Sequence, residues 1–528
     1  MIDLGPTSRL KNGPPLSRRR VLAQGAAIGA AAALVGASYT AAAEPKKGGT
    51  LIAGVAHGST TDTLDPATYE NNYMVGLANG IHNFLTEIDP SGALVPELAE
   101  SWEAGDQARQ WIFILRKGVT FSNGRTVTAR DVVASIDHHR GVDSNSGAKP
   151  LVAGIESLRA DGDWRVIFDL SAGNADFAYI LSDVHLPIMP AKEDGTIDWA
   201  SGIGAGGYIL REFEPGVRAK LSRNPNYWKS HRAHFAEIEL LSIVDAAARS
   251  NALITGEIQV MDRCDLKTVH LLERTPGLRV EEITGTLHYT FPMRTDIAPF
   301  DDVDVRLALK YAIDRDEMVR KIIRGRGVAG NDHPIGPANR FFAKELEQRG
   351  YDPERARFHL KQAGLTGLSV DLSTSEAAFG GAVDAAVLYK EQAAPAGIDI
   401  TVVREPNDGY WSNVWLKKPW CACYWSGRPT EDLMFSMAYE AGADWNDTYW
   451  NNERFNRLLV QARAELDQDL RRDLYQEMQA LVRDDGGAVI PLFPNYVFAT
   501  SDRVQHEPQM AGNWDLDGER FMERWWFA

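Results

Sequence analysis

The stretch of residues 420–432, WCACYWSGRPTED, gathers more groups able to recognise a ligand than any other part of the sequence. Its aromatic rings can form flat apolar walls. Its guanidinium, Arg428, can hold a carboxylate or phosphate through two parallel hydrogen bonds, or it can pair with Glu431 or Asp432 at the surface, and the residues alone favour neither. Core packing competes equally for each single tryptophan, but ligand contact is the better interpretation of the whole stretch. We therefore expect a binding turn made by Tyr424, Trp425, Ser426 and Arg428.

Catalysis is the rival class of function, and the sequence carries no motif for it. The twelve histidines are scattered and form no His-Glu-x-x-His, Gly-x-Ser-x-Gly or phosphate-loop pattern. Residues 137–139, Asp-His-His, superficially resemble a phosphoesterase metal triplet. They fall at the end of a predicted helix, without the further acidic motifs of such enzymes, so we interpret them as a solvated helix end. We expect no enzyme activity, no cofactor and no metal; a periplasmic hydrolase is the alternative from a different class.

The three cysteines are Cys264, Cys421 and Cys423. Cys421 and Cys423 are too close in sequence for an easy disulfide, because side chains at i and i+2 of a strand lie about 6–7 Å apart. A metal site would need further Cys or His partners, and none stands nearby in sequence. We expect packed thiols.

The elements that must position these groups alternate between strand and helix. Alternating apolar residues predict strands over Leu51–Val55, Trp111–Leu115, Trp164–Phe168 and Val217–Leu221. Helical spacing of apolar residues predicts one helix from about Asp304 to Arg324 and two helices between about Glu453 and Val482. Residues 368–373, 382–394 and 398–404 read as strand, helix and strand, which usually form a right-handed crossover in a parallel sheet. The chain is therefore expected to be of the α/β class.

The first 43 residues differ from the rest of the chain. Arg18-Arg19-Arg20 precedes an uncharged stretch, residues 21–35, that is shorter than the roughly 18–20 apolar residues needed to cross a bilayer. Three alanines, residues 41–43, then offer a small-residue cleavage site. This layout predicts an export signal of the twin-arginine type, cleaved after Ala43.

The remaining residues, 44–528, are strongly acidic. The export segment holds five Lys and Arg against Asp3, so it carries net +4, and the net charge of −16 for the whole chain becomes −20 without it. Such a chain would be repelled by nucleic-acid phosphates and by anionic lipid, so we expect no nucleic-acid partner.

Seven short stretches, in order along the chain, carry a family resemblance. They are KGGTL (47–51), DTLDP (62–66), LVPELAESW (94–102), FILRKGVTFSNG (113–124), TARDVV (128–133), RNPNYW (223–228) and PFDDVDVR (299–306), the last followed by AIDR (312–315). Each alone is weak, but their order, spacing and content resemble the family 5 extracytoplasmic solute-binding proteins of ABC importers, the peptide, nickel and opine class. The resemblance covers nearly all of residues 44–528.

This resemblance implies a two-lobed periplasmic binding protein fold of type II, with an extra small domain and a cleft that closes about a hinge. The domain boundaries it suggests are 44–88, 200–298 and 497–528 for lobe I, 89–199 for the small domain and 299–496 for lobe II. It also implies a monomeric periplasmic receptor for peptides or peptide-like solutes, which delivers its ligand to an ABC permease in the inner membrane. A receptor of the same fold for an opine, sugar-phosphate or metal chelate is the alternative.

The resemblance adds ligand-binding residues outside the turn. Tyr69, Asn72 and Tyr73 stand in a stretch that faces the cleft in similar proteins, and Met293 and Arg294 lie at the presumed lobe crossover. Trp445-Asn446 reads as an exposed aromatic-amide pair, whereas Trp411 and Trp415, spaced as on one helix face, are expected to pack in the core. In the alignment with peptide-binding relatives, Trp425 stands where an acidic residue pairs with the terminal ammonium of the peptide. The sequence departs from the free-peptide pattern there, which argues against a free-peptide ligand and, with Arg428, suggests the opine, sugar-phosphate or chelate alternative.

Overall fold

The computed structural model describes residues 45–407, 409–428 and 430–528. It divides the chain into Met1–Ala43 and Glu44–Ala528, and the fold below is that of the second unit. The expected export signal lies outside the described residues, as does Pro429 of the predicted binding turn. No helix within the described ranges is both long enough and apolar enough to cross a membrane.

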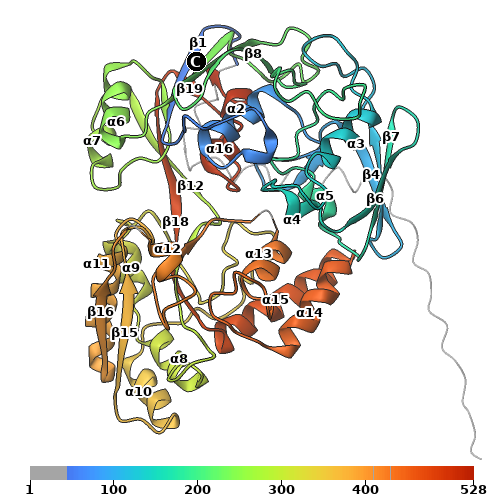
Figure 1. The fold of residues 1–528 in the computed structure, drawn as a ribbon. Coiled ribbons are helices and arrows are strands. Elements are labelled where there is room, and N and C mark those ends of the chain that lie inside the picture. The colour runs from blue at the N-terminus through green and yellow to red at the C-terminus, as the bar shows by residue number, and fades with distance from the viewer. Residues whose placement is uncertain (1–44, 408, 429) are drawn as a thin grey trace, which may run out of the picture. The chain divides into compact units, whose positions relative to one another are not determined.

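A ten-stranded mixed sheet is the backbone of this unit. Its strands follow the order β17-β13-β18-β11-β1-β10-β9-β8, and β12 and β14 also pair with β18. The longest strand, β18 (Ala488–Ser501), pairs near its start with β13 (His288–Pro292) and β14 (Gly327–Ala329), and near its end with β11 (Val260–Met261) and β12 (Leu278–Thr284). Figure 1 shows β18 running from the group of elements that holds β1 to the group that holds β15. One strand therefore belongs to both lobes.

The first lobe is built on the β1 end of this sheet. β1 (Thr50–Val55) runs parallel to β10 (Glu237–Ser242) and β11, while β9 (Arg218–Arg223) and β8 (Tyr208–Glu214) follow antiparallel. These strands confirm two of the predicted ones. Helices α2 (Asn72–Ile81), α6 (Ala246–Thr255), α7 (Val269–Glu273), α16 (Asp515–Glu519) and α17 (Phe521–Arg524), the 3-10 turn at Pro66–Thr68 and the pair β19 (Val504–Gln505) and β20 (Trp526–Phe527) complete it.

A four-stranded antiparallel sheet encloses a core of its own. Its order is β4 (Ala99–Gly105), β5 (Gln110–Leu115), β7 (Arg165–Leu170) and β6 (Ile155–Ala160), which confirms the other two predicted strands. Helices α3 (Ala129–Asp137), α4 (Lys149–Val152) and α5 (Phe177–Ile180) accompany it, and β2 (Thr86–Ile88) pairs with β3 (Leu94–Pro96) beside it. Phe113, Phe168 and Phe177 pack edge to face at its centre. A separate core is consistent with the proposed small domain, whose boundaries stay a prediction.

The second lobe carries the predicted crossover. β15 (Leu368–Thr374) and β16 (Ile398–Arg404) pair in parallel, joined by α11 (Ala382–Ala393) and a 3-10 turn at Ala394–Ala396, as expected. The two helices predicted between residues 453 and 482 are also confirmed, as α14 (Glu453–Ala464) and α15 (Gln468–Asp485). The lobe further holds α10 (Pro353–Gln362), α12 (Tyr410–Asn413), β17 (Cys423–Trp425) and α13 (Glu431–Ala438).

The single helix predicted from Asp304 to Arg324 is wrong. The structure has two helices, α8 (Val303–Tyr311) and α9 (Arg315–Lys321). Asp314 has extended backbone angles, and its side chain accepts a hydrogen bond from the Glu317 amide, so it acts as the N-cap of a new helix. The helical spacing of the apolar residues continues across this cap, which is why the sequence reads as one element.

Candidate functional site

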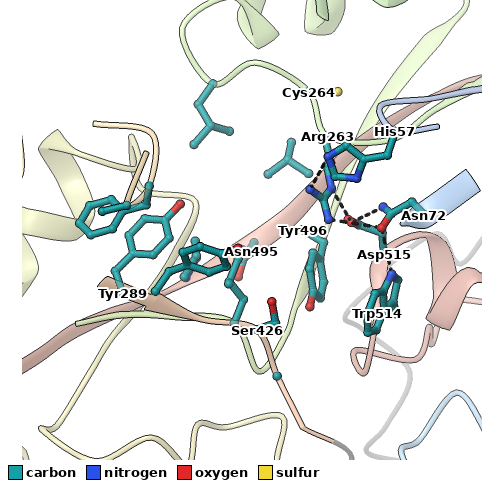
Figure 2. A pocket seen from close by; sticks show the side chains of 18 of the residues that line it. His57, Asn72, Arg263, Cys264, Tyr289, Ser426, Asn495, Tyr496, Trp514 and Asp515 are labelled. Carbon is teal, nitrogen blue, oxygen red and sulfur yellow. Dashed lines mark hydrogen bonds and ion pairs between the residues drawn. The ribbon is translucent and has the colours of Figure 1, made fainter. Parts of the chain in front are cut away.

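A cavity of about 480 Å³ opens where β18 passes between the two lobes. Asn495, Tyr496 and Val497 of β18 line it, together with a polar wall and an aromatic wall from opposite sides, as Figure 2 shows. This volume falls within the range of small-molecule sites, roughly 300–1,000 Å³. We refer to it as the cleft.

Asn72 is the centre of the polar wall, which belongs to the first lobe. It begins α2, and its side-chain amide donates to the carboxylates of Asp262, at 3.1 Å, and Asp515, at 3.0 Å. Its oxygen accepts from the Trp514 indole at 3.1 Å and from the Arg263 guanidinium at 3.3 Å. Arg263 also donates to Asp515 at 3.1 Å. A guanidinium and a carboxylate thus stand side by side on the cleft wall (Figure 2).

The backbone around this wall is unusual. Arg263 has a φ of 44°, in the left-handed region that side chains rarely adopt. Four successive residues, Leu516 to Glu519, also have positive φ values of 45°, 62°, 69° and 55°. A non-glycine residue in this region costs roughly 1–3 kcal/mol, and runs of such residues are rare. The left-handed turn follows directly on Trp514 and Asp515, so the strain lies beside two side chains of the cleft.

The polar wall contains buried acidic side chains with few cations beside them, and this shifts their pKa values. Burial raises the pKa of Asp262 to about 6, and the neighbouring Asp515 adds to the shift. Burial also raises the pKa of Glu519 well above its usual range, with further contributions from Asp515 and Asp262. Neither oxygen of Glu519 has a hydrogen-bond partner among the residues that the structure describes. His57 accepts from Arg263, and burial together with that guanidinium lowers its pKa to about 4, so it is neutral at pH 7.

The aromatic wall comes from the second-lobe end of the sheet and from the segment before α11. Tyr289 of β13 stacks on Phe379, with ring centroids 4.0 Å apart and planes 9° from parallel. Tyr424 of β17 is paired with Tyr289 across the strands and is 39% exposed. The cleft therefore offers flat apolar area opposite a mixed-charge surface.

A second cavity, of about 300 Å³, adjoins the cleft along β17. Four tryptophans line it, Trp411, Trp415, Trp425 and Trp445, together with Cys423 and Arg428. Tyr424 and Ser426 line both cavities. The turn predicted to contact ligand is thus the rim shared by the two.

Six of the predicted contact residues line one or both cavities. They are Asn72 in the cleft, Tyr424 and Ser426 in both, and Trp425, Arg428 and Trp445 in the second cavity. The sequence reasoning missed Arg263, Tyr289, Phe379 and Trp514. No local pattern distinguishes these four, because they come from four separate parts of the chain: after β11, in β13, before α11 and before α16.

The other five predicted contacts line neither cavity, and each has a partner within the fold. Buried Tyr69 and Tyr73 direct their hydroxyls to the carbonyls of Leu64 and Glu214, and Met293 is fully buried in the second-lobe core. Arg294 pairs with Asp296 at 2.7 Å, and the side-chain amide of Asn446 donates to the carbonyls of Glu440 and Trp450. Their role as ligand contacts stays a prediction.

Arg428 does not pair with Glu431 or Asp432, so that alternative is wrong. Asp432 forms an ion pair with Arg463 at 3.0 Å, and Glu431 accepts from the Phe341 amide at 2.7 Å. The two acids lie at the start of α13 and face into the lobe. Arg428 instead donates to the Met437 thioether and to the carbonyls of Ser426 and Gly427. Burial lowers its pKa, and within the described ranges it has no ion-pair partner.

Three further expectations are settled by the structure. All three cysteines are free and buried, as predicted. The solvated helix end is wrong for His139, which is buried and hydrogen-bonded to Ser146 at 2.6 Å because the end of α3 packs against a loop. Core packing is wrong for Trp411: α12 is only four residues long, and the Trp411 side chain is 40% exposed.

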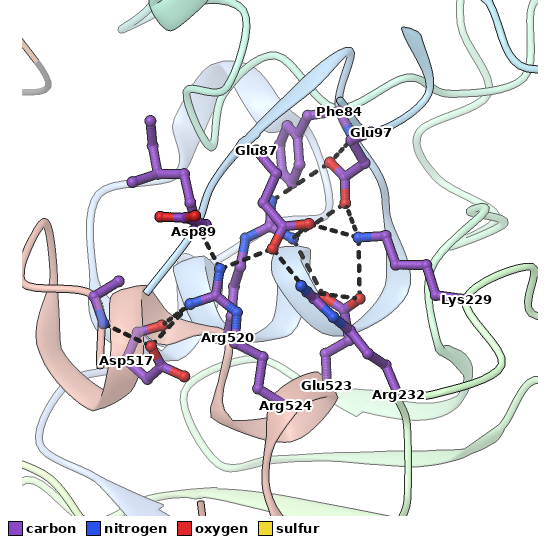
Figure 3. A network of polar contacts seen from close by, with 12 residues as sticks. Phe84, Glu87, Asp89, Glu97, Lys229, Arg232, Asp517, Arg520, Glu523 and Arg524 are labelled. Carbon is purple, nitrogen blue, oxygen red and sulfur yellow. Dashed lines mark hydrogen bonds and ion pairs between the residues drawn. The ribbon is translucent and has the colours of Figure 1, made fainter. Parts of the chain in front are cut away.

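A cluster of buried charges, drawn in Figure 3, contributes no residue to the lining of either cavity. Glu87, Glu97 and Glu523 place oxygens within 4.8 Å of one another, close enough for a shared metal ion. Lys229 occupies their centre instead, with its ammonium 2.6, 2.6 and 3.1 Å from the three carboxylates, and Arg232, Arg520 and Arg524 surround them. Each of the three carboxylates is paired with a cation, so the cluster holds β2, the loop at Lys229 and helix α17 together.

Comparison with known proteins shows which family this chain resembles. Residues 93–447 match the family model of bacterial extracellular solute-binding proteins, family 5. The dipeptide-binding protein of Escherichia coli is 27% identical over 75% of this chain and 80% of its own length.

Two solved structures share the fold over almost their whole length. The periplasmic binding protein DppA of Helicobacter pylori, in complex with the peptide STSA, has a TM-score of 0.72 at 23% identity and covers 92% of this chain and 99% of its own. AgaA of A. tumefaciens R10, in complex with agropinic acid, has a TM-score of 0.72 at 22% identity, covering 91% and 99%. The two-lobed mixed α/β fold expected from the sequence is thereby confirmed.

Proposed function

The chain belongs to family 5 of the bacterial extracellular solute-binding proteins, and from this premise we propose that it is the receptor of an ABC importer for a peptide or peptide-like solute. It would bind this solute in the cleft and deliver it to a permease in the inner membrane. The observation that carries the proposal is the cleft itself. Its size suits a short solute, and its two walls offer stacked aromatic area opposite a paired guanidinium and carboxylate. A solute with both charges and an apolar body matches such a pair of walls.

The titratable groups of the cleft support binding rather than catalysis. A nucleophile or base must hold the right protonation state near neutral pH. Burial raises the pKa of the Cys264 thiol to about 12, so it is not a thiolate, and His57 is held neutral by its contact with Arg263. Arg263 donates to one oxygen of Asp515, and both side chains hold Asn72. We therefore propose that the protein captures its solute without transforming it.

Arg428 favours a second candidate, a receptor for an anionic solute such as an opine. Among the described residues, this desolvated guanidinium has a thioether and two carbonyls as its acceptors, which leaves unused capacity for a carboxylate. AgaA, which shares the fold, is known in complex with agropinic acid. Peptides would bind whether or not Arg428 is present, whereas opines would require it.

Closure of the cleft follows from how the lobes are joined. β18 crosses between them, as do residues 284–288, which link β12 to β13, so a few backbone segments can act as the hinge. We propose that the solute stabilises the closed form of a monomer. Light scattering with and without solute would give the monomer mass in both cases, with a smaller radius in the bound form.

Export to the periplasm is also part of the proposal, and its support is the N-terminal sequence. If Arg18 and Arg19 form a twin-arginine signal, replacing both by Lys leaves uncleaved precursor in the cytoplasm. Normal periplasmic accumulation of the double variant would point to the general secretory route instead.

Ligand screening by thermal unfolding tests the binding function. A solute that binds only the native protein stabilises it by RT ln(1 + [L]/Kd), about 2.7 kcal/mol at one hundred times Kd. We expect a compound from a set of peptides and opines to raise Tm. Tyr424→Ala, in the shared rim, should weaken that shift. Phe358→Ala, at an exposed aromatic on α10, is the control and should leave it unchanged.

A further inference from the structure

Three indole rings in the second cavity stand in a nearly equilateral triangle. The ring centroids of Trp415 and Trp425 lie 6.1 Å apart, those of Trp415 and Trp445 6.2 Å, and those of Trp425 and Trp445 6.1 Å. The ring planes are inclined to one another by 70°, 70° and 51°. Trp411 extends the group, packed edge to face on Trp415 at 5.9 Å. We call Trp415, Trp425 and Trp445 the indole box.

The box is open to solvent. Trp445 is 46% exposed and Trp411 is 40% exposed, although Trp425 is buried. A cluster whose only role was core packing would hide its largest side chains, because a buried tryptophan contributes more to stability than an exposed one. Large apolar side chains left exposed around a cavity mark a binding surface.

The geometry of the box suits a positive charge. A point in the plane of the three centroids is roughly 3.5 Å from each, so a cation several ångströms above that plane stays within the roughly 6 Å over which an aromatic face attracts it. The protein demonstrates this chemistry itself, since the Arg428 guanidinium lies 5.8 Å from the centre of the Trp425 ring. The faces of Trp415 and Trp445 are free of such an internal cation among the described residues.

A buried carboxylate lies behind the box. One oxygen of Asp447 accepts from the indole N–H of Trp415 at 3.1 Å and from that of Trp425 at 3.2 Å. Asp447 is buried, and no Lys or Arg pairs with it within the described ranges. An anion on the N–H edge of an indole makes the ring more electron-rich, and its negative charge adds to the attraction of the box for a cation.

From these observations we infer that the indole box is a subsite for an organic cation, an ammonium, guanidinium or methylated ammonium group carried by the solute. This inference rests on the proposed function, because Tyr424 and Ser426 join the box to the cleft and make it part of the same site. The net charge of −20 over residues 44–528 would steer such a solute toward the protein.

Choline and its neutral isostere 3,3-dimethylbutan-1-ol test the chemistry of the box. The two have the same shape, but only choline is charged. Calorimetric titration of the purified protein into the millimolar range should show binding of choline at least tenfold tighter than that of the alcohol. Equal binding of the two would overturn the inference, because the cavity would then recognise apolar volume only.

Substitutions of Trp445, the exposed indole of the box, test whether choline binds there. Trp445→Leu should weaken choline binding at least tenfold, and Trp445→Phe should retain most of it, because phenylalanine keeps an aromatic face. Phe358→Leu is the control for loss of an exposed ring elsewhere. Because Trp445 is half exposed, its replacement should leave the unfolding transition intact, and circular dichroism would verify this. Unchanged choline binding by Trp445→Leu would contradict the assignment.

Matched peptides separate this inference from the proposed function. The tripeptides Ala-Lys-Ala and Ala-norleucine-Ala differ in one ammonium group, and we expect the lysine peptide to bind at least tenfold tighter through Trp445. If both bind equally, the receptor function stands and the cation subsite is refuted. If choline binds through Trp445 but no peptide or opine binds, the box stands and the proposed solute class is refuted.

Discussion

Replacing Asn72 by Asp tests the central polar contact of the cleft with almost no change of shape. The amide nitrogen of Asn72 lies 3.1 Å from an oxygen of Asp262 and 3.0 Å from an oxygen of Asp515, both buried. In the variant, at pH values above the Asp262 pKa of about 6, an acceptor would face two acceptors. Two ionised carboxylates 3 Å apart repel by about 5 kcal/mol even at an effective dielectric constant near 20. The new side chain would therefore take up a proton to fold.

Proton uptake sets the size of the effect and its pH dependence. An unperturbed Asp has a pKa of about 3.9, so holding it protonated costs about 1.4 kcal/mol for each pH unit above that value, or about 4 kcal/mol at pH 7 and 1.5 kcal/mol at pH 5. The folded pKa is raised, so the stabilisation present at low pH is lost as pH rises. Asn72→Asp should thus lose stability relative to the natural protein by about 1.4 kcal/mol per pH unit above pH 6, where Asp262 of the natural protein is ionised.

Urea unfolding at pH 6, 7 and 8 would measure this slope. Asn251→Asp, at an exposed position of α6, is the matched control and should change the free energy of unfolding by less than about 0.5 kcal/mol at each pH. A loss for Asn72→Asp that is small or independent of pH would refute the arrangement of Asn72 between two buried acids. The ligand-induced rise in Tm should also shrink in this variant, because the cleft wall would be rearranged.

Three further predictions concern other parts of the structure. Lys229→Met removes the ammonium shared by three buried carboxylates and should lower the free energy of unfolding by about 3–5 kcal/mol. The control Lys220→Met, at an exposed position, should lower it by less than about 1 kcal/mol. Urea unfolding would measure both. Burial raises the pKa of Asp447 to about 6, so its contribution to stability falls by roughly 2 kcal/mol as pH rises from 4 to 7. In Asp447→Asn that part of the pH dependence should vanish, although Cys423, Trp415, Trp425 and Tyr439 around it remain. Arg428→Ala should change the unfolding free energy by less than about 1 kcal/mol. It should weaken binding of an anionic solute by about 2–5 kcal/mol, mostly through faster dissociation, which surface plasmon resonance would measure. Unchanged affinity for opines would remove the second candidate function.

Much of the scaffold could be predicted from the sequence, because local patterns determine it. Strand alternation and helical spacing located β1, β5, β7, β9 and the crossover from β15 to β16. The same reasoning failed at Asp314, where one capping side chain ends a helix that the apolar spacing continues. It also failed for Trp411, because a spacing of four residues suggests a helix face whether or not the helix extends that far.

The site was only half predictable, for a physical reason. The turn at Tyr424, Ser426 and Arg428 could be found because aromatic and charged residues cluster there in the sequence itself. Arg263, Tyr289 and Trp514 come from three distant segments and meet only after β18 joins the lobes. Arg428 shows a further limit, because two acids nearby in sequence point away from it into the lobe.

Native mass spectrometry of the protein purified from the cells that produce it naturally tests the central claim most directly. We expect a co-purifying solute of small-peptide or opine mass, bound one to one, present with Phe358→Ala and depleted in Tyr424→Ala, since Tyr424 lines both cavities. Adding that solute back to the emptied protein should raise Tm. A protein that emerges empty, and whose Tm no peptide, opine or organic cation raises, would contradict the account of the cleft as the binding site of a transport receptor.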